Sequence, residues 1–503
     1  MFLLAQVGEF VRPDIDFHAF SPEFVLVGTI VVVLLADLLK PPGRKGSASL
    51  PALAGIGLLA ALIPVLTLAN EGADRIMFGG AYVVDDFSLV LKALFLASGY
   101  IVVLLSTNYI AEGDYAEGEY YFLVLCSILG MIVMASARDL ITIFVALELL
   151  SIPAYMLAGW RKEDLKSNEA GAKYYLMGVF ASAVMLYGMS LIYGVTGSTI
   201  LVDIGEFLSR VEGEPAILTL GILFVLIGFA FKVSAVPFHT WAPDTYEGSP
   251  TPVTAFLAVL SKSAGFVALM MLIVVAFQAR AEVFQPFMWV LAVATMTVGN
   301  LIALRQTNIV RMLAYSGIAQ AGFMLAPLAV AGDNPTGAVE AIVTYLIIYA
   351  AMNLGAFAVV LAVARKTGSG EISSFGGLFQ YAPGLTVAMT MFLFSLAGIP
   401  PLGGWLAKFE VFRAVVSANT PAAYVLAVFL AVNSVIALFY YANLAREMWM
   451  NPTPDGNESP IRIPPSLVAA VAITAALTLA FGVSNLATRF GNLAELTSLA
   501  TGN

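Results

Sequence analysis

Charged residues are scarce in this chain of 503 residues. Asp, Glu, Lys and Arg make up 11% of it, whereas soluble domains carry about 25%. Hydrophobic residues make up 60%, a surplus too large for a water-soluble core, so lipid must be part of the solvent. The composition therefore predicts an all-α integral membrane protein, formed by one continuous helical bundle in a lipid bilayer.

Residues that bind metals and redox cofactors are also few. The one cysteine, Cys126, can form no internal disulfide, and an iron–sulfur cluster needs about four thiolates. The two histidines, His18 and His239, lie far apart in the sequence, which disfavours haem ligation by this chain. The net charge of -9 is modest, and no basic patch suggests nucleic acid. We therefore expect no cofactor, no metal and no nucleic acid on this chain.

Apolar runs long enough to cross a membrane recur along the sequence. Such a helix needs about 17–25 residues, and about fourteen runs of this kind lie between Pro22 and Phe481. With the N-terminus outside, inside loops hold about twelve Lys and Arg residues and outside segments about seven, so the positive-inside rule favours an N-out, C-out topology. No basic region precedes the first apolar residues, and we expect no signal peptide.

Ionisable residues within the predicted spans are the most informative, because charge at membrane depth is costly and usually functional. Glu148 lies about eight residues, or ~12 Å, into its helix, too deep to reach the surface easily. Lys173 begins the next helix and a short turn joins the two, so we expect a Glu148–Lys173 ion pair. Alternatively, Lys173 is an interfacial lysine whose amine extends to the membrane surface.

Two further lysines lie deeper. Lys232 is followed five residues later by Pro237, which predicts a broken helix whose freed carbonyls face a wet cavity. Lys262 lies about ten residues, or ~15 Å, into its span, near the middle of the bilayer. Alternatively, Lys262 is a structural lysine bonded only to backbone carbonyls. His239 follows the break and can change charge near neutral pH, or it is a capping or loop histidine.

A second break precedes Lys408, because two prolines and two glycines interrupt the predicted span Gly384–Phe412. A Pro-x3-Trp spacing occurs at both breaks, about five spans apart, and is a weak signal of an inverted repeat. Lys92 lies about six residues into its span and is interpreted as a lysine whose amine extends to the interface, with a functional role as the alternative. Asp37 and the Arg138–Asp139 pair lie near predicted helix ends and are interpreted as interfacial.

A row of buried lysines suits proton transfer. Desolvation disfavours a charged lysine and a nearby carboxylate favours it, so movement of the carboxylate or of water can switch the lysine between holding and releasing a proton. A sodium path would instead need several oxygen ligands. The hypothesis is a proton relay made of Glu148, Lys173, Lys232, Lys262, Lys408 and His239.

Segments that contain these residues resemble the antiporter-like membrane subunits of respiratory complex I, which are similar to subunits of multi-subunit sodium/proton antiporters. The stretch FKVSAVPFHTWAPDTYEGSPTPV at 231–253 is highly specific for that group, and the likeness runs from about Asp85 to Glu447. The segments SIPAYMLAGW at 151–160 and AGIPPLGGWLAKFEVF at 397–412 are most similar to the subunit N family.

The resemblance implies about fourteen membrane helices, two inverted five-helix repeats with discontinuous helices, and a half-channel in each repeat. It also implies that the matching glutamate pairs with the first lysine and that the later lysines relay protons, with His239 as a connecting group. It divides the chain into N-terminal helices (1–119), a first antiporter-like repeat (120–280), a second repeat (281–450), and a C-terminal helix and tail (451–503).

The activity implied by the resemblance is proton pumping by a membrane subunit of NADH:quinone oxidoreductase, a translocase. Its NADH, FMN, iron–sulfur clusters and quinone are expected in partner subunits, which include neighbouring antiporter-like and small membrane subunits. The expected location is the bacterial inner (plasma) membrane. The alternatives are a subunit of a multi-subunit cation/proton antiporter and a scaffold whose buried charges only specify packing.

Overall fold

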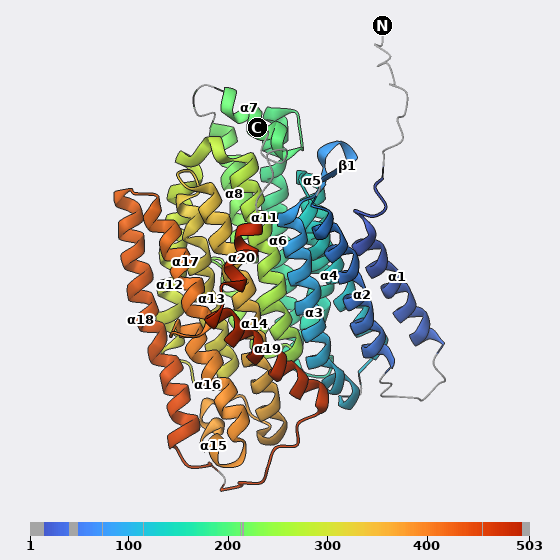
Figure 1. Cartoon of the computed structure of the whole chain (residues 1–503), viewed down its shortest axis with the longest axis vertical. Helices are drawn as coiled ribbons and strands as arrows, with labels where there is room; N and C mark the ends of the chain where they lie inside the picture. The colour runs from blue at the N-terminus through green and yellow to red at the C-terminus, as the bar shows by residue number, and fades with distance from the viewer. Residues whose placement is uncertain are drawn as a thin grey trace.

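The computed structural model describes residues 15–39, 49–72, 74–113, 115–211, 213, 216–454 and 456–494. Long helices run roughly along one axis and pack side by side (Figure 1). Four of the basic residues counted for topology lie outside the described residues: Arg12, Lys40, Arg44 and Lys45. The N-terminal segment in which no signal peptide is expected also lies outside them.

The helices follow one another with short connections. The first eleven are α1 (Ser21–Leu38), α2 (Ser49–Glu71), α3 (Asp86–Glu112), α4 (Glu117–Ser136), α5 (Leu140–Ala158), α6 (Leu165–Thr196), α7 (Leu201–Arg210), α8 (Ala216–Lys232), α9 (Trp241–Gly248), α10 (Thr251–Phe256) and α11 (Lys262–Met271). The remaining ones are α12 (Ala281–Ala303), α13 (Ile309–Leu325), α14 (Pro335–Thr367), α15 (Leu378–Tyr381), α16 (Pro383–Ala397), α17 (Gly403–Ser417), α18 (Pro421–Met450), α19 (Pro465–Val483) and α20 (Leu486–Leu493).

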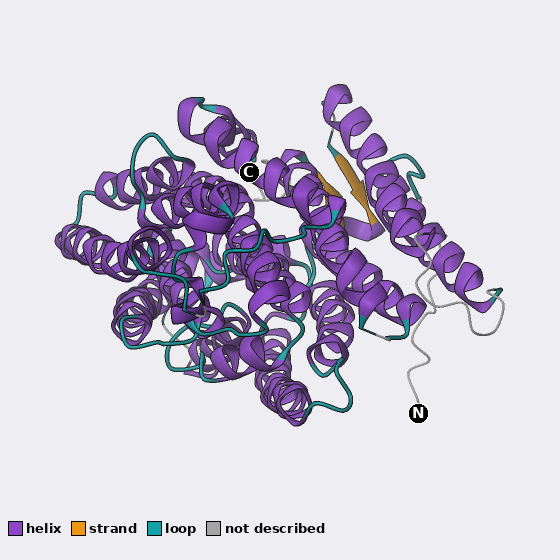
Figure 2. Ribbon diagram, turned by 90° about the horizontal axis from the view of Figure 1, so that it is seen from below, coloured by secondary structure: helices purple, strands orange, loops and turns teal. Residues whose placement is uncertain are grey.

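The predicted membrane fold is confirmed. Within the described ranges, 12 helical segments are long and apolar enough to cross a membrane. Two shorter apolar helices, α8 and α16, end at the predicted breaks and are followed by α9 and α17. Together these elements account for the fourteen or so predicted spans. Viewed from below, the helices are seen nearly end-on beside one small hairpin, in which β1 (Arg75–Met77) pairs antiparallel with β2 (Tyr82–Val84) (Figure 2).

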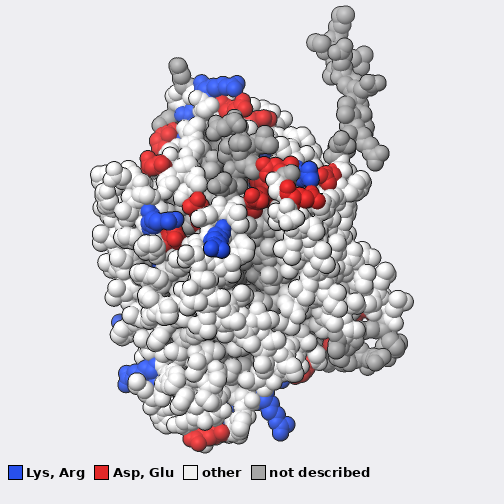
Figure 3. All heavy atoms as spheres, viewed as in Figure 1, with Lys and Arg blue, Asp and Glu red and all other residues white. Residues whose placement is uncertain are grey.

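The surface fits a lipid environment. On the face seen in Figure 3, Lys, Arg, Asp and Glu lie mostly toward the two ends, and other residues occupy the broad zone between them. Large apolar side chains are exposed on outward-facing helices, as Val145 is on α5, Phe180 on α6 and Phe439 on α18. Apolar surface of this extent is costly in water, so the exterior of the bundle is suited to acyl chains.

The span at the centre of the bundle, Thr251–Ala276, has every residue of its most apolar window buried. It consists of α10, the π-helical turn η2 (Leu257–Ser261), α11 and a second π-helical turn, η3 (Leu272–Ala276). We call it the central helix. Lys262 lies where η2 meets α11. Since π-helical turns are rare and concentrate at functional sites, the backbone conformation also indicates that the position of Lys262 is functional.

Both predicted helix breaks are present, between α8 and α9 and between α16 and α17. Carbonyls before each break lose their helical donors. At the first break the Trp241 indole donates to the Phe231 carbonyl at 3.1 Å, and at the second the Lys408 ammonium donates to the Ala397 carbonyl at 2.9 Å. The shared Pro-x3-Trp spacing does not give equivalent side chains, because Trp241 is 2% exposed and Trp405 is 47% exposed.

The interpretation of Lys92 and Arg138 as interfacial is wrong. Lys92 is 0% exposed; its amine pairs with Glu23 of α1 at 2.9 Å and donates to the Tyr82 hydroxyl at 3.1 Å. Arg138 is also buried and pairs with Asp85 at 2.8 Å. A lysine near a helix end reaches the surface only where nothing covers it, and here α1 and β2 supply its partners. These two pairs fix the N-terminal helices to the bundle.

Replacing Lys92 with methionine is expected to destabilise the fold by about 3–5 kcal/mol, because the Glu23 carboxylate stays buried without its partner. The free energy of unfolding in detergent micelles measures the loss. A double variant that also carries Glu23→Gln removes the orphaned charge, and we expect it to recover part of the stability. Equal stability of Lys92→Met and the parent would contradict the pair.

Candidate functional site

Three lysines lie inside the bundle without a counter-ion. Lys232 is 4% exposed, Lys262 is 2% exposed and Lys408 is partly buried. The ion pairs of the described residues include none of the three. Because an isolated ammonium is costly in apolar surroundings, the hydrogen bonds that each lysine makes determine how easily it can hold a charge.

Lys232 contacts helices α5 and α6. Its amine donates to the Ser151 hydroxyl on α5 at 2.8 Å and to the Tyr174 hydroxyl on α6 at 3.5 Å. Glu148 lies one turn before Ser151 on α5 and therefore shares its face. The Glu148 carboxylate accepts a hydrogen bond from Ser182 at 2.6 Å and acts electrostatically on Lys232.

The predicted Glu148–Lys173 pair is wrong, because the register of α5 against α6 separates the two residues. Gly159 packs against Gly171 so closely that a Cβ on Gly171 would lie 3.0 Å from the Gly159 Cα. Glu148 lies eleven residues before Gly159 on α5, and Ser182 lies eleven residues after Gly171 on α6. These two side chains are hydrogen-bonded. Lys173 is only two residues from Gly171, so it lies at the end of the helix pair.

Lys262 is held by the backbone of α13. Its amine donates to the Gly317 carbonyl at 2.6 Å. A Cβ on Gly317 would lie 3.3 Å from this nitrogen and 3.1 Å from the Tyr349 hydroxyl, so glycine permits the close approach. The stem of Lys232 packs on the same central helix, where a Cβ on Gly265 would lie 3.1 Å from the Lys232 Cγ. The two lysines are therefore neighbours within about one turn of the central helix.

A hydrogen-bonded set of uncharged side chains continues from this point along α13. The Ser316 hydroxyl is 2.5 Å from the Tyr441 hydroxyl, and Gln320 donates to that hydroxyl at 3.2 Å. Gln320 also accepts from Tyr345 and donates to the Leu396 carbonyl at 3.0 Å. The sequence interpretation missed this set because it followed charged residues only. The available signal was a serine and a glutamine spaced four apart on an apolar helix.

Lys408 meets the far end of that set. Its amine donates to the carbonyl of Ala397, the residue after Leu396, and lies 4.6 Å from the centre of the Phe323 ring. Gly398 has a φ of 92°, and a Cβ there would lie 2.9 Å from the Lys408 Cδ. Glycine thus permits both the left-handed turn and the passage of the lysine stem.

His239 lies half-buried on the loop after α8. Its Nδ1 has no hydrogen-bond partner among the described residues, and its ring centre is 6.5 Å from that of Tyr315 on α13. The hydrogen bonds of the described part of the chain do not join it to Lys232 or Lys262, so its connecting role stays a prediction.

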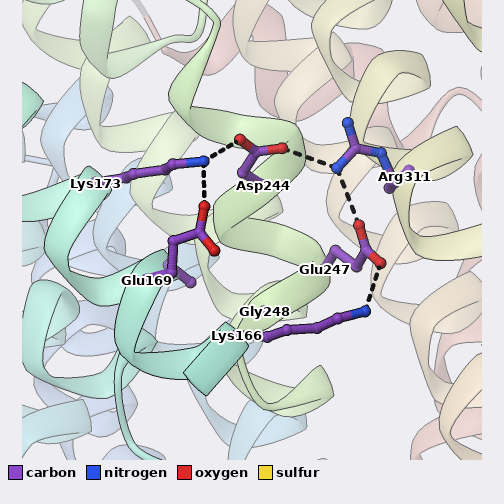
Figure 4. A pocket seen from close by; sticks show the side chains of 8 residues that line it. Lys166, Glu169, Lys173, Asp244, Glu247, Gly248 and Arg311 are labelled. Atoms are coloured by element: carbon purple, nitrogen blue, oxygen red, sulfur yellow. Dashed lines mark hydrogen bonds and ion pairs between the residues drawn. The ribbon is translucent and has the colours of Figure 1, made fainter. Parts of the chain in front are cut away.

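A charged pocket of about 280 Å³ opens at the end of the bundle where α6 begins. Lys173, the last of the six predicted relay residues to be located, lies in this pocket. It pairs with Glu169 at 2.6 Å and with Asp244 at 2.7 Å. Arg311 of α13 pairs with Asp244 at 2.8 Å and with Glu247 at 2.9 Å (Figure 4). These side chains point toward one another across the pocket.

The sequence interpretation assigned no role to Asp244, Glu247 or Arg311. A signal was present, since Asp244 and Glu247 are spaced three apart and such residues share one face of a helix. Among the described residues, no group of three or more His, Cys, Asp or Glu could hold a metal ion.

Comparison with known proteins gives the family. A family model described as NADH:quinone oxidoreductase/Mrp antiporter, TM, matches residues 137–436. NADH-quinone oxidoreductase subunit N of Trichlorobacter lovleyi is 41% identical over 441 residues, which cover 87% of this chain and 88% of that protein.

Solved structures agree. A chain of respiratory complex I from Thermus thermophilus with bound aureothin has a TM-score of 0.75 and 32% identity, and covers 92% of this chain and 97% of its own. A chain of the Mrp complex from Dietzia sp. has a TM-score of 0.81 over 95% of this chain and 97% of its own, but at 21% identity it shows the fold alone. The chain therefore belongs to the NADH-quinone oxidoreductase subunit N family, the antiporter-like membrane subunits of complex I.

Proposed function

We propose that this chain translocates protons across the membrane as a subunit of an NADH:quinone oxidoreductase, while partner subunits pass electrons from NADH to quinone. The observation that carries the proposal is the row of Lys232, Lys262 and Lys408 inside the bundle, each bonded to neutral groups only. A lysine without a counter-ion in such surroundings can give up its proton at low cost.

The contacts suggest an order of transfer. Glu148 lies one turn from Ser151, to which Lys232 donates, so approach of the carboxylate would favour the charged lysine and its withdrawal would favour release of the proton. Lys262 lies on the central helix, about one turn from the point where the stem of Lys232 packs against it, and receives the proton next. Gln320 and Tyr441 then span the distance to the second break, where Lys408 lies. Hydroxyl and amide groups of this kind can order the water that carries protons.

The alternative function is that of a cation/proton antiporter subunit, and the Mrp likeness gives it the same fold. Two observations favour the first proposal. The identity to subunit N is 41%, against 21% to the Mrp chain. Apart from Glu148, the path is lined by lysines and neutral groups, whereas a sodium site needs several oxygen ligands, carboxylates among them. Co-purification with redox subunits would separate the two functions.

We place the chain in the bacterial plasma membrane with both termini outside, next to other antiporter-like and small membrane subunits of the complex. In this orientation the charged pocket of Lys173 and Asp244 faces the inside and the β1–β2 hairpin faces the outside. The cofactors NADH, FMN, iron–sulfur clusters and quinone belong to the partners, which agrees with the scarcity of cysteine and histidine in this chain.

Replacing Lys232 with alanine in the assembled complex is expected to lower NADH-driven proton pumping at least about tenfold, since loss of a positioned proton carrier costs about 100-fold or more in acid–base catalysis. Quenching of a pH-sensitive dye in inverted vesicles measures pumping, and NADH:ferricyanide activity reports that the redox subunits are present. The control is Lys162→Ala, which removes an exposed lysine. Pumping by Lys232→Ala at the parental rate would refute the relay hypothesis.

A further inference from the structure

A carboxylate joins the two halves of the chain at the mouth of the charged pocket. Asp244 on α9 uses both oxygens: Oδ2 lies 2.7 Å from the Lys173 amine on α6, and Oδ1 lies 2.8 Å from Nη1 of Arg311 on α13. Figure 4 shows Asp244 between the two cations. The segment after the first helix break is therefore tied to one helix of each predicted repeat.

The surrounding charges balance. Glu169 adds a second carboxylate to Lys173, Glu247 adds one to Arg311, and Lys166 approaches Glu247 at 3.5 Å. The network holds three cations and three anions. All six side chains are at least partly exposed to solvent. Exposed ion pairs are individually weak and are screened by salt, so such a network can open and close, unlike the buried pairs of the N-terminal helices.

An aromatic pair lies behind this network, on the way to Lys232. Tyr174 follows Lys173 on α6, and its ring stacks on that of Trp241 with centres 4.4 Å apart. Trp241 precedes Asp244 by one turn of α9, and the Tyr174 hydroxyl is 3.5 Å from the Lys232 amine. Both rings are buried. The ion pair between Lys173 and Asp244 therefore pins together the two helices that carry the two stacked rings.

We propose that Lys173, Asp244 and Arg311 form an ionic latch that keeps the Tyr174–Trp241 stack closed between the charged pocket and Lys232. Opening of the latch lets α6 and α9 separate, and water then reaches Lys232 from the pocket. The three latch residues act as positioning residues through the stack. The use of this access for proton uptake rests on the proposed function, but the access itself does not.

Thiol labelling tests the latch in the assembled complex in inverted vesicles, which expose the inner face. Cys126→Ser removes the one native cysteine, and Ser151→Cys places a reporter beside Lys232, behind the stack. The probe is a small cationic methanethiosulfonate. We expect Asp244→Asn to raise the labelling rate roughly tenfold, the scale set by loss of two exposed ion pairs. An unchanged rate would overturn the latch.

The matched control is Glu206→Gln, which breaks an exposed ion pair to Arg210 on α7 and should leave the rate unchanged. An equal increase in this control would overturn the specific role of Asp244. The dependence of the labelling rate on salt gives a second measurement. High ionic strength should speed labelling while Asp244 is present and should have little effect on Asp244→Asn. A salt-independent rate with Asp244 in place would contradict the proposal.

The two proposals fail separately. Labelling measures access and does not need proton pumping or NADH. Unchanged labelling removes the latch and leaves the relay of Lys232 and Lys262 standing. Parental pumping by Lys232→Ala removes the relay, and the latch then remains as a device that controls water in the first break.

Discussion

Exchange of Lys262 for methionine is expected to lower NADH-driven proton pumping by the assembled complex about 100-fold, with electron input from NADH intact. Lys262 lies between the other two lysines. The stem of Lys232 packs against Gly265, three residues after Lys262 on the central helix, and the Lys262 amine reaches α13, whose polar side chains lead to Lys408. Methionine keeps the length of the side chain but cannot carry a proton. Dye quenching and NADH:ferricyanide activity measure the two quantities.

Arginine at the same position separates a relay from a structural lysine. The amine of Lys262 donates to a backbone carbonyl, which is the contact that a purely structural lysine would also make. Arginine supplies a donor and a charge but stays protonated in proteins. The relay therefore predicts that Lys262→Arg assembles and does not pump. Normal pumping by either Lys262 variant would support the scaffold alternative and refute the relay.

Replacing Gly317 with valine, with Lys262 itself unchanged in the sequence, is expected to lower pumping at least about tenfold, since misplacement of a reacting group by about 1 Å can cost about 100-fold. Even the first side-chain carbon would lie 3.3 Å from the lysine nitrogen and 3.1 Å from the Tyr349 hydroxyl, and valine adds two methyl groups beyond it. The lysine would have to leave the Gly317 carbonyl.

The matched control for this prediction is Gly194→Val. Gly194 is also helical, on α6, and a Cβ there meets nothing within 4 Å, so the same substitution is made in a helix without the close contact. Pumping and the midpoint of thermal unfolding should be compared for both variants. Equal pumping by Gly317→Val and Gly194→Val would show that the distance between Lys262 and the carbonyl is unimportant.

Much of the site could be predicted from the sequence because ionisable residues are rare in apolar helices. Lys232, Lys262 and Lys408 stand out against their neighbours, and the structure buries the first two almost completely. The helix breaks were also predictable, since proline has no backbone donor and disturbs the turn before it. Such signals are local and do not depend on what packs against the helix.

Partners of the charged residues were not predictable in this way. The short turn between the two helices suggested that Glu148 pairs with Lys173. The Gly159–Gly171 contact instead sets a register in which Ser182 lies opposite Glu148. Lys92 read as interfacial because no sequence signal shows that Glu23, 69 residues earlier in the chain, covers it. Each error comes from not knowing which residues meet: the covering partners of Lys92 and Arg138 also decide that these two side chains are buried.

The amino-acid sequence could identify this chain as a membrane-embedded helical bundle with two broken helices and a row of buried lysines. It could do so because composition, helix length and proline chemistry act locally along the chain. The contacts among these residues follow from three-dimensional packing: Lys232 donates to Ser151, one turn from Glu148, Lys262 reaches Gly317, and Asp244 bridges Lys173 and Arg311. Those contacts depend on helix register and on close glycine packing between segments far apart in sequence, which no local pattern specifies.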